Sequence, residues 1–222
     1  MIQKTITEVF VLQDDIKSLK GIKNFAILGG TFDPIHFGHI SVAEAVLNQT
    51  NVEKVLLIPS GKPPHKEHED VSDGCTRLEM ARLAVEGHKN MLVSSIEIDR
   101  GGMTYTVDTV AQLKELLGDE VEFKFIMGAD AIHYITTWKD YKHLLHLCSF
   151  IAVTRPGYNK NAMAKEIEKM EEHFKCDIEF IEIPPVDVSS SQIRENIGNG
   201  ISINGMVPDK VEDYILKKGL YK

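Results

Sequence analysis

Short apolar runs alternate along this chain with segments of helical periodicity, and this alternation restricts the fold more than any other feature. The runs are rich in Val, Ile and Phe, as expected of strands buried on both faces of a parallel sheet. Strands are predicted at residues 25–28, 55–58, 91–98, 121–127, 150–153 and 178–183. Helices are predicted at residues 40–49, 77–86, 107–117, 162–174 and 190–197, with a last helix between Pro208 and Gly219. The sequence therefore predicts an α/β fold, a doubly wound parallel sheet of five to six strands.

Length and composition narrow the class of protein. A chain of 222 residues suits one α/β domain, which we place at residues 23–222 behind an N-terminal extension, residues 1–22, of unknown role. The net charge of −8 argues against nucleic-acid binding. The three cysteines are widely spaced, and neither a membrane-spanning run nor a signal peptide is recognisable. We expect a cytoplasmic protein with no membrane partner, and the sequence leaves a homo-oligomer open.

The most informative segment is GGTFDPIHFGH, which follows the first predicted strand. Ligands of α/β sheets bind beyond the carboxyl ends of strands, where helix N-termini present free N–H groups. Gly29 and Gly30 leave room there for phosphate oxygens. His36 and His39 lie one helical turn apart, so both imidazoles can donate to phosphate, and a nearby polyphosphate favours the protonated form of each. The segment contains neither GK[ST] nor GxGxxG, which excludes a P-loop and a dinucleotide fingerprint.

A second polar cluster, VSSSQIR, begins at Val188 and precedes a predicted helix. Serine hydroxyls commonly cap helices, so capping alone could explain part of it. Three serines and Arg194 exceed what a cap requires. We therefore predict that Ser189, Ser190 and Arg194 hold the β- and γ-phosphates of a triphosphate, with the guanidinium donating to their oxygens.

These two segments resemble the HxGH and ISSTxIR motifs of the nucleotidyltransferase superfamily, and GGTFDPIHFGH is most similar to the bacterial nicotinate-nucleotide adenylyltransferase family. Val188 and Ser191 replace the usual Ile and Thr of the second motif. The resemblance covers the chain from about Phe25 to the last helix and implies a Rossmann-like, HxGH-type nucleotidyltransferase fold. It implies His36, His39 and Arg194 as catalytic residues. The residues that it implies for ATP are Gly29, Gly30, Thr31, Phe32, His36, His39, Gly128, Asp130, Ser189, Ser190, Ile193 and Arg194.

Further segments are similar to the parts of that family that bind nicotinate mononucleotide. Residues 100–109, RGGMTYTVDT, resemble the family's RxxxSYTxDT stretch, and they imply Thr104, Tyr105 and Thr106 as contacts, with the Thr106 N–H on the pyridine carboxylate. Thr106 also suits the N-cap of the following helix. Trp138 matches the tryptophan that stacks on the pyridine ring, and its polar neighbours favour a partly exposed side chain. Lys66, in a PPHK-like segment, is expected to contact phosphate.

Two more resemblances and one open question concern the remaining loops. Gly128 and Asp130 belong to a GAD segment whose aspartate lies near the ATP ribose in the family. Arg155 lies in a TRPGY segment whose role the sequence does not define. His65 and His68, with Glu69 next to His68, could suggest a metal site. No third well-spaced ligand accompanies them, so a solvated charged loop is the better interpretation. We predict no protein metal site and expect Mg²⁺ to arrive with ATP, held by phosphates and water.

The resemblance implies transfer of AMP from ATP to nicotinate mononucleotide, with release of pyrophosphate. A pantetheine-phosphate adenylyltransferase or a cytidylyltransferase would share the first motif but would not need the TYT stretch and Trp138. The absence of a KMSKS motif and the acidic charge oppose a fragment of a tRNA ligase. The intact histidines and Arg194 oppose a non-catalytic nucleotide sensor.

Overall fold

The computed structural model describes residues 16–19, 21–62, 71–118, 120–154, 167–168, 170–172, 174 and 176–222. Six parallel strands form one sheet in the order β3-β2-β1-β4-β5-β6. This order reverses direction between β1 and β4, which is the topological switch point of a doubly wound sheet. The strands are β1 (Asn24–Gly30), β2 (Lys54–Pro59), β3 (Met91–Val93), β4 (Glu122–Gly128), β5 (Ser149–Thr154) and β6 (Ile178–Glu182). The predicted fold class is confirmed.

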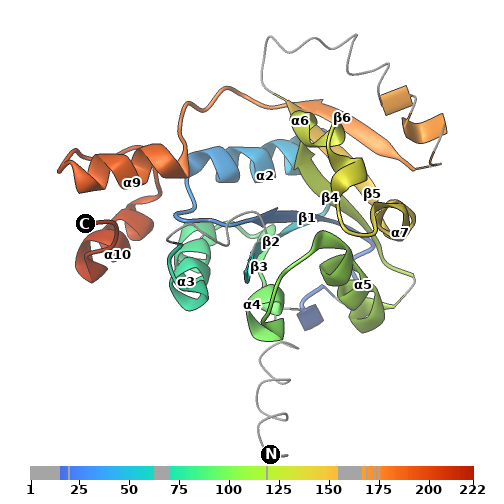
Figure 1. The fold of residues 1–222 in the computed structure, drawn as a ribbon, viewed down its shortest axis with the longest axis horizontal. Coiled ribbons are helices and arrows are strands. Elements are labelled where there is room, and N and C mark those ends of the chain that lie inside the picture. Colours follow the sequence, from blue (N-terminus) through green and yellow to red (C-terminus); the bar gives the residue numbers. More distant parts are fainter. Residues whose placement is uncertain are drawn as a thin grey trace, which may run out of the picture.

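Helices cover both faces of the sheet, and Figure 1 shows α2 and α5 on opposite sides of β1. Side chains alternate along each strand, so β1 contributes Ala26 and Leu28 to one apolar core and Phe25 and Ile27 to the other. The described helices are α2 (Phe37–Gln49), α3 (Gly74–Val85), α4 (Ile96–Arg100), α5 (Thr106–Leu117), α6 (Ala129–Ile132), the 3₁₀ helix η2 (Ile135–Thr137), α7 (Tyr141–Leu147), α9 (Ser190–Gly198) and α10 (Asp209–Lys218).

The two cores divide the helices between the faces. Helices α2, α3, α9 and α10 bury apolar residues in the first core, whereas α4, α5, α6 and α7 bury theirs in the second. Within the segment that we separated as an extension, Ile16 and Leu19 are also buried in the second core. These two residues therefore pack with the domain, and the boundary at residue 22 stays a prediction.

One strand prediction was wrong for more than half of its residues. The expected strand at 91–98 ends at Val93, and Ile96 begins helix α4. Two serines cause the change: the Ser94 hydroxyl accepts a hydrogen bond from the Ile96 N–H, and the Ser95 hydroxyl donates to the Asp99 carboxylate. Such local hydrogen bonds compete with a strand ladder. Most of the predicted helix at 162–174 lies outside the described residues.

Candidate active site

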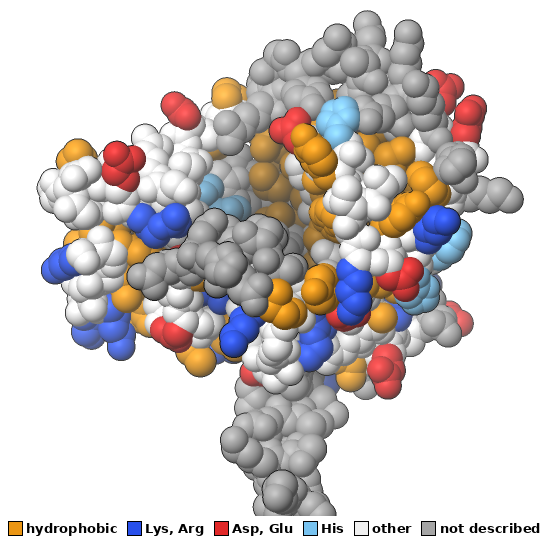
Figure 2. All heavy atoms as spheres, viewed as in Figure 1, with side chains coloured by type: hydrophobic (Ala, Val, Ile, Leu, Met, Phe, Trp, Pro, Cys, Tyr) orange, Lys and Arg blue, Asp and Glu red, His pale blue; other side chains and the backbone are white. Residues whose placement is uncertain are grey.

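A cleft of about 1250 Å³ opens at the carboxyl ends of β1 and β4, on both sides of the switch point. Its floor consists largely of apolar strand residues such as Ile27, Phe125 and Met127, and Figure 2 shows hydrophobic side chains within a hollow on the face in view. Single small-molecule sites usually have volumes of about 300–1,000 Å³. The cleft is therefore large enough for two substrates. Of the residues predicted to bind ligands, those that line it are Gly29, Gly30, Thr31, Thr104, Tyr105, Thr106, Gly128, Asp130 and Trp138.

The two glycines that follow β1 differ in their surroundings. A Cβ on Gly30 would lie 2.6 Å from the ring of Phe32, so only glycine lets that ring pack where it does. A Cβ on Gly29 would make an ordinary contact of 3.6 Å with Phe125. Phe32 is buried, with a left-handed backbone (φ 52°), and its ring meets the His39 ring edge-on at 4.9 Å. Gly30 thus serves the packing beneath the loop, in addition to the phosphate clearance expected from the sequence.

The two histidines are fixed by hydrogen bonds at the start of α2. His36 is the N-cap, and its Nδ1 accepts from the Gly38 N–H at 3.1 Å. The Nδ1 of His39 accepts from the His36 N–H at 3.2 Å, which completes a capping box. Since each Nδ1 is an acceptor, the proton of each neutral ring lies on Nε2. The ring centroids are 3.8 Å apart, so the two rings and their Nε2 groups lie close together.

Gly38 makes this arrangement sterically feasible. A Cβ at this position would lie 2.9 Å from Cε1 and Nδ1 of His36. Real Cβ atoms essentially never come so close, so any larger residue at position 38 must displace the His36 ring. The HxGH spacing therefore has a packing reason as well as a chemical one.

His39 is neutral in the folded protein. Burial and, to a smaller extent, the nearby His36 lower the pKa of His39 to about 3. A proton on Nδ1 would also face the His36 N–H and break the capping box. The neutral ring can donate to phosphate through Nε2, and protonation beside a bound polyphosphate stays a prediction.

The serine and arginine cluster meets the histidine loop. The Ser190 hydroxyl donates to the carbonyl of Pro34 at 2.9 Å, and Nη1 of Arg194 donates to the carbonyl of Asp33 at 2.7 Å. Ser189 caps α9 by accepting from the Gln192 N–H at 3.2 Å. Ile193 is fully buried and anchors this helix to the first core. Segments about 160 residues apart are thus joined, and Ser190 and Arg194 support the loop, a role that the sequence did not indicate.

His36, His39, Phe32, Ser189, Ser190, Ile193 and Arg194 are not among the residues that line the cleft. They lie directly beside it. Thr31 lines the cleft and immediately precedes Phe32, and Val42, one turn after His39 on α2, lines it as well. The histidine loop therefore adjoins the cleft, and the serine-arginine helix is bonded to that loop.

The other end of the cleft carries the residues expected to contact a pyridine mononucleotide. Helix α5 begins at Thr106, with Tyr105 as N-cap and no side chain capping it, so the proposal of Thr106 as N-cap was wrong. Without a side-chain cap, the first N–H groups of α5 remain available to an anion. Trp138 is half-buried and meets Phe125 edge-on at 6.0 Å, as expected for a partly exposed ring. Lys66 and Arg155 lie outside the described residues.

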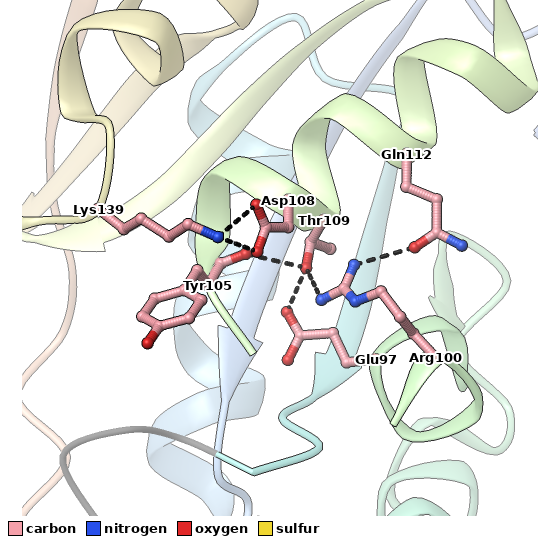
Figure 3. Close-up of polar contacts among 7 residues, drawn as sticks. All are labelled: Glu97, Arg100, Tyr105, Asp108, Thr109, Gln112 and Lys139. Atoms are coloured by element: carbon pink, nitrogen blue, oxygen red, sulfur yellow. Dashed lines mark hydrogen bonds and ion pairs between the residues drawn. The ribbon is translucent and has the colours of Figure 1, made fainter. Parts of the chain in front are cut away.

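A polar network beside Tyr105 includes residues that the sequence did not reveal (Figure 3). Figure 3 shows Glu97 and Arg100 both directed at the Thr109 hydroxyl, which donates to Glu97 Oε1 at 2.6 Å and accepts from Arg100 Nη2 at 2.8 Å. Burial raises the pKa of Glu97, and the hydrogen bond from Thr109 partly opposes this shift. Lys139 pairs with the Asp108 carboxylate at 2.8 Å.

The same network reaches the cleft wall. Nζ of Lys139 lies 4.5 Å from the ring centroid of Tyr105, and Glu97, Thr109 and Lys139 all line the cleft. Glu97 was missed because it lies in an apolar run that reads as a strand. The network fixes Tyr105 and the first turn of α5, where the acceptor is expected to bind.

The last predicted contacts lie at the ends of β4 and β5. Gly128 is the N-cap of the short helix α6, and Asp130 is exposed in its first turn. Thr154, the last residue of β5, also lines the cleft and was not predicted from the sequence. Within the described part of the chain, no group of three or more His, Cys, Asp or Glu side chains could hold a metal ion. None of the described helices is long and apolar enough to cross a bilayer.

Fold and site together define a nucleotidyltransferase of the HxGH type, and a model of the cytidylyltransferase-like family matches residues 27–196. Curated relatives narrow the class. A protein of Thermoanaerobacter sp. (strain X514) is 43% identical over 88% of this chain and 93% of its own length, and one of Moorella thermoacetica is 44% identical over 88% and 90%. Both are named "Probable nicotinate-nucleotide adenylyltransferase". The chain belongs to the nicotinate-nucleotide adenylyltransferase family.

Solved structures support the fold. The nicotinic acid mononucleotide adenylyltransferase of Plasmodium falciparum, complexed with NaAD, superposes with a TM-score of 0.72 at 24% identity, covering 90% of this chain and 97% of that one. The same protein complexed with APC gives a TM-score of 0.71 with the same coverage.

Proposed function

We propose that this enzyme transfers AMP from ATP to the phosphate of nicotinate mononucleotide, forming deamido-NAD and pyrophosphate. One observation carries the proposal: the serine-arginine helix is hydrogen-bonded to the histidine loop, which adjoins the cleft at Thr31, and Trp138 and the start of α5 line the same cleft. This arrangement suits two anionic substrates bound with their phosphates adjacent.

The reaction needs positioning and charge stabilisation more than a strong base. The phosphate of nicotinate mononucleotide is largely ionised at neutral pH, so it can attack the α-phosphorus of ATP directly, and the bond to the bridging oxygen of pyrophosphate breaks. Negative charge shifts to the leaving pyrophosphate, and preorganised donors lower the energy of that transition state.

We assign the donors by their places. His36 and His39 direct their Nε2 groups to the α- and β-phosphates, because both rings are held by Nδ1 acceptor bonds. The amino end of α9, with Ser190 and Arg194, takes the β- and γ-phosphates. Gly29, Gly30 and Thr31 line the cleft where the chain leads into the histidine loop.

The remaining contacts select the two nucleosides. Asp130 accepts hydrogen bonds from the ATP ribose, and Trp138 stacks on the pyridine ring. The first N–H groups of α5 receive the pyridine carboxylate, an anion at a helix N-terminus. An amide in that place would direct its NH₂ toward N–H donors, which weakens binding.

Mg²⁺ is proposed to enter with ATP rather than as a resident ion. Mg²⁺ prefers oxygen ligands and often binds through substrate phosphates and water, and no metal-binding cluster occurs among the described side chains. When bound, it neutralises charge on the polyphosphate. The protein's own residues orient and select the substrates.

Release of pyrophosphate from ATP, measured with several acceptors, tests the proposal. We expect turnover with nicotinate mononucleotide and a much lower kcat/KM with its amide. Equal efficiency with acid and amide would refute the assigned carboxylate site. Turnover only with 4′-phosphopantetheine, or with CTP in place of ATP, would refute the proposed substrates.

A further inference from the structure

The penultimate residue of the chain contacts the histidine loop. The hydroxyl of Tyr221 donates to Oδ1 of Asp33 at 2.6 Å, although the two residues are 188 positions apart. Asp33 is buried, with 3% of its surface exposed, and lies three residues before His36. Neither Tyr221 nor Asp33 lines the cleft.

Asp33 receives hydrogen bonds from three distant segments. Its Oδ2 accepts from the Ser72 N–H at 3.2 Å, just before α3, and its carbonyl accepts from Arg194 at 2.7 Å. Tyr221 provides the third bond. A buried carboxylate with these partners fixes both the side chain and the backbone of the loop. The backbone at 33–34 leads directly to the His36 cap, so its placement sets the start of α2.

The chain reaches Asp33 through a specific helix ending. Helix α10 stops at Gly219, which is left-handed (φ 62°), and the Leu220 N–H donates back to the Ile215 carbonyl at 3.1 Å. Tyr221 itself has φ 64°, a backbone conformation that is unfavourable for a residue with a Cβ. Contacts must hold it there, and both Leu220 and Tyr221 pack against the first core.

The Tyr221 hydroxyl remains a donor over the working pH range. Burial and the adjacent Asp33 carboxylate raise the pKa of Tyr221 well above its usual value. The sulfur of Met80 lies 3.9 Å from the same hydroxyl. The hydroxyl therefore lies between α3 and the loop.

A second buried side chain, from α3, also supports the loop. Arg77, only 2% exposed, donates to the carbonyls of Thr31 at 2.7 Å, Gly61 at 3.1 Å and Ser72 at 2.8 Å. It anchors the first part of the loop and the end of β2. Tyr221 and Arg194 both anchor Asp33, through its side chain and its carbonyl, and these bonds set where the histidines begin.

We propose that Tyr221 is a positioning residue for adenylyl transfer, acting through Asp33 to hold the histidine loop so that His36 and His39 meet the phosphates of ATP. This inference rests on the proposed function, because the rate of that reaction is its principal readout.

Tyr221→Phe removes only the hydroxyl, and Tyr214→Phe is the matched control. Tyr214 is half-buried on α10 beneath Lys218, away from the loop. At a temperature well below the unfolding transition of either variant, we expect Tyr221→Phe to lower kcat on the order of 10-fold, because small misplacements of catalytic groups have large effects. The KM for nicotinate mononucleotide should stay within about twofold, since that end of the cleft is untouched. Tyr214→Phe should match the wild type.

A purely structural role would lower Tm and leave kcat unchanged at that temperature, and this result would overturn the proposal. A double-mutant cycle adds a second test. If Tyr221 acts through Asp33, Asp33→Asn combined with Tyr221→Phe should lower kcat no further than the more damaging single change. If the losses in kcat of the two single variants multiply in the double variant, the two residues act separately, and this result would also overturn the proposal.

Hydrogen exchange separates this proposal from the proposed function. In the wild-type protein and in Tyr221→Phe, amide exchange is followed in peptides covering residues 29–39 and, as internal reference, residues 104–110. We expect faster exchange in the first peptide alone. A wild-type enzyme without turnover would refute the function, and faster exchange at 29–39 would still support positioning by Tyr221. Unchanged exchange would refute it whatever the activity.

Discussion

The neutral state of His39 in the folded protein predicts how the stability of the protein depends on pH. Burial lowers the pKa of His39 to about 3, whereas an unfolded chain has a histidine pKa of about 6.5. The unfolded chain therefore binds this proton more tightly than the folded protein. The contribution of His39 to stability is complete above pH 6.5 and is lost progressively as the pH falls to about 3.

The expected magnitude follows from the distance between pH 5 and the unfolded-state pKa. That distance is about 1.5 units, and each unit is worth about 1.36 kcal/mol, so His39 alone should lower the free energy of unfolding by about 2 kcal/mol between pH 7 and pH 5. A shift of this size is a large part of the 5–15 kcal/mol that is typical of domains.

His39→Asn is the informative substitution. The asparagine carbonyl can occupy the place of Nδ1 and accept from the His36 N–H, so the capping box persists while the titrating group is removed. Urea unfolding of both proteins at pH 7 and pH 5 measures the effect. The wild type should lose about 2 kcal/mol more than His39→Asn over this interval. Equal losses would refute the conclusion that His39 is neutral in the folded protein.

Other substitutions test separate parts of the site. Gly38→Ala should lower kcat on the order of 100-fold, because the new Cβ would lie 2.9 Å from the His36 ring; a near-normal kcat in steady-state assays would contradict this packing. Trp138→Ala should raise the KM for nicotinate mononucleotide on the order of 10-fold through loss of stacking, and an unchanged KM would exclude the ring as a platform. The gain in the free energy of unfolding of Glu97→Gln over the wild type should be larger at pH 7 than at pH 4.5. Burial raises the pKa of Glu97 above 4.5, so its ionisation disfavours the folded state, and urea unfolding that shows no such difference would contradict this reasoning.

The sequence predicted the sheet well because buried parallel strands leave a strong apolar signal. Five of the six strands lie within about two residues of their predicted bounds, and the fold class is confirmed. The failure at 91–98 has a local cause, since Ser94 and Ser95 turn the chain into α4. Helices α6 and α7 and the 3₁₀ turn η2 were missed because each is too short to show a periodic pattern.

The site was predictable where chemistry is encoded locally. His36 and His39 are three residues apart in the sequence, and their spacing alone indicated paired rings. Contacts between distant segments left no such signal. Nothing in the sequence indicates that the Tyr221 hydroxyl donates to Asp33, or that Arg77 donates to three carbonyls. The neutral state of His39 was also unpredictable, because it depends on burial that only the fold creates.

The central claim is that the histidine loop and the amino end of α9 hold one triphosphate together. A crystal structure with a non-hydrolysable ATP analogue and nicotinate mononucleotide tests it most directly. We predict phosphate oxygens within hydrogen-bonding distance of Nε2 of His36 and His39 at one side, and of Ser190 or Arg194 at the other. A triphosphate that contacts only one of these groups, or lies elsewhere on the protein, would contradict the account.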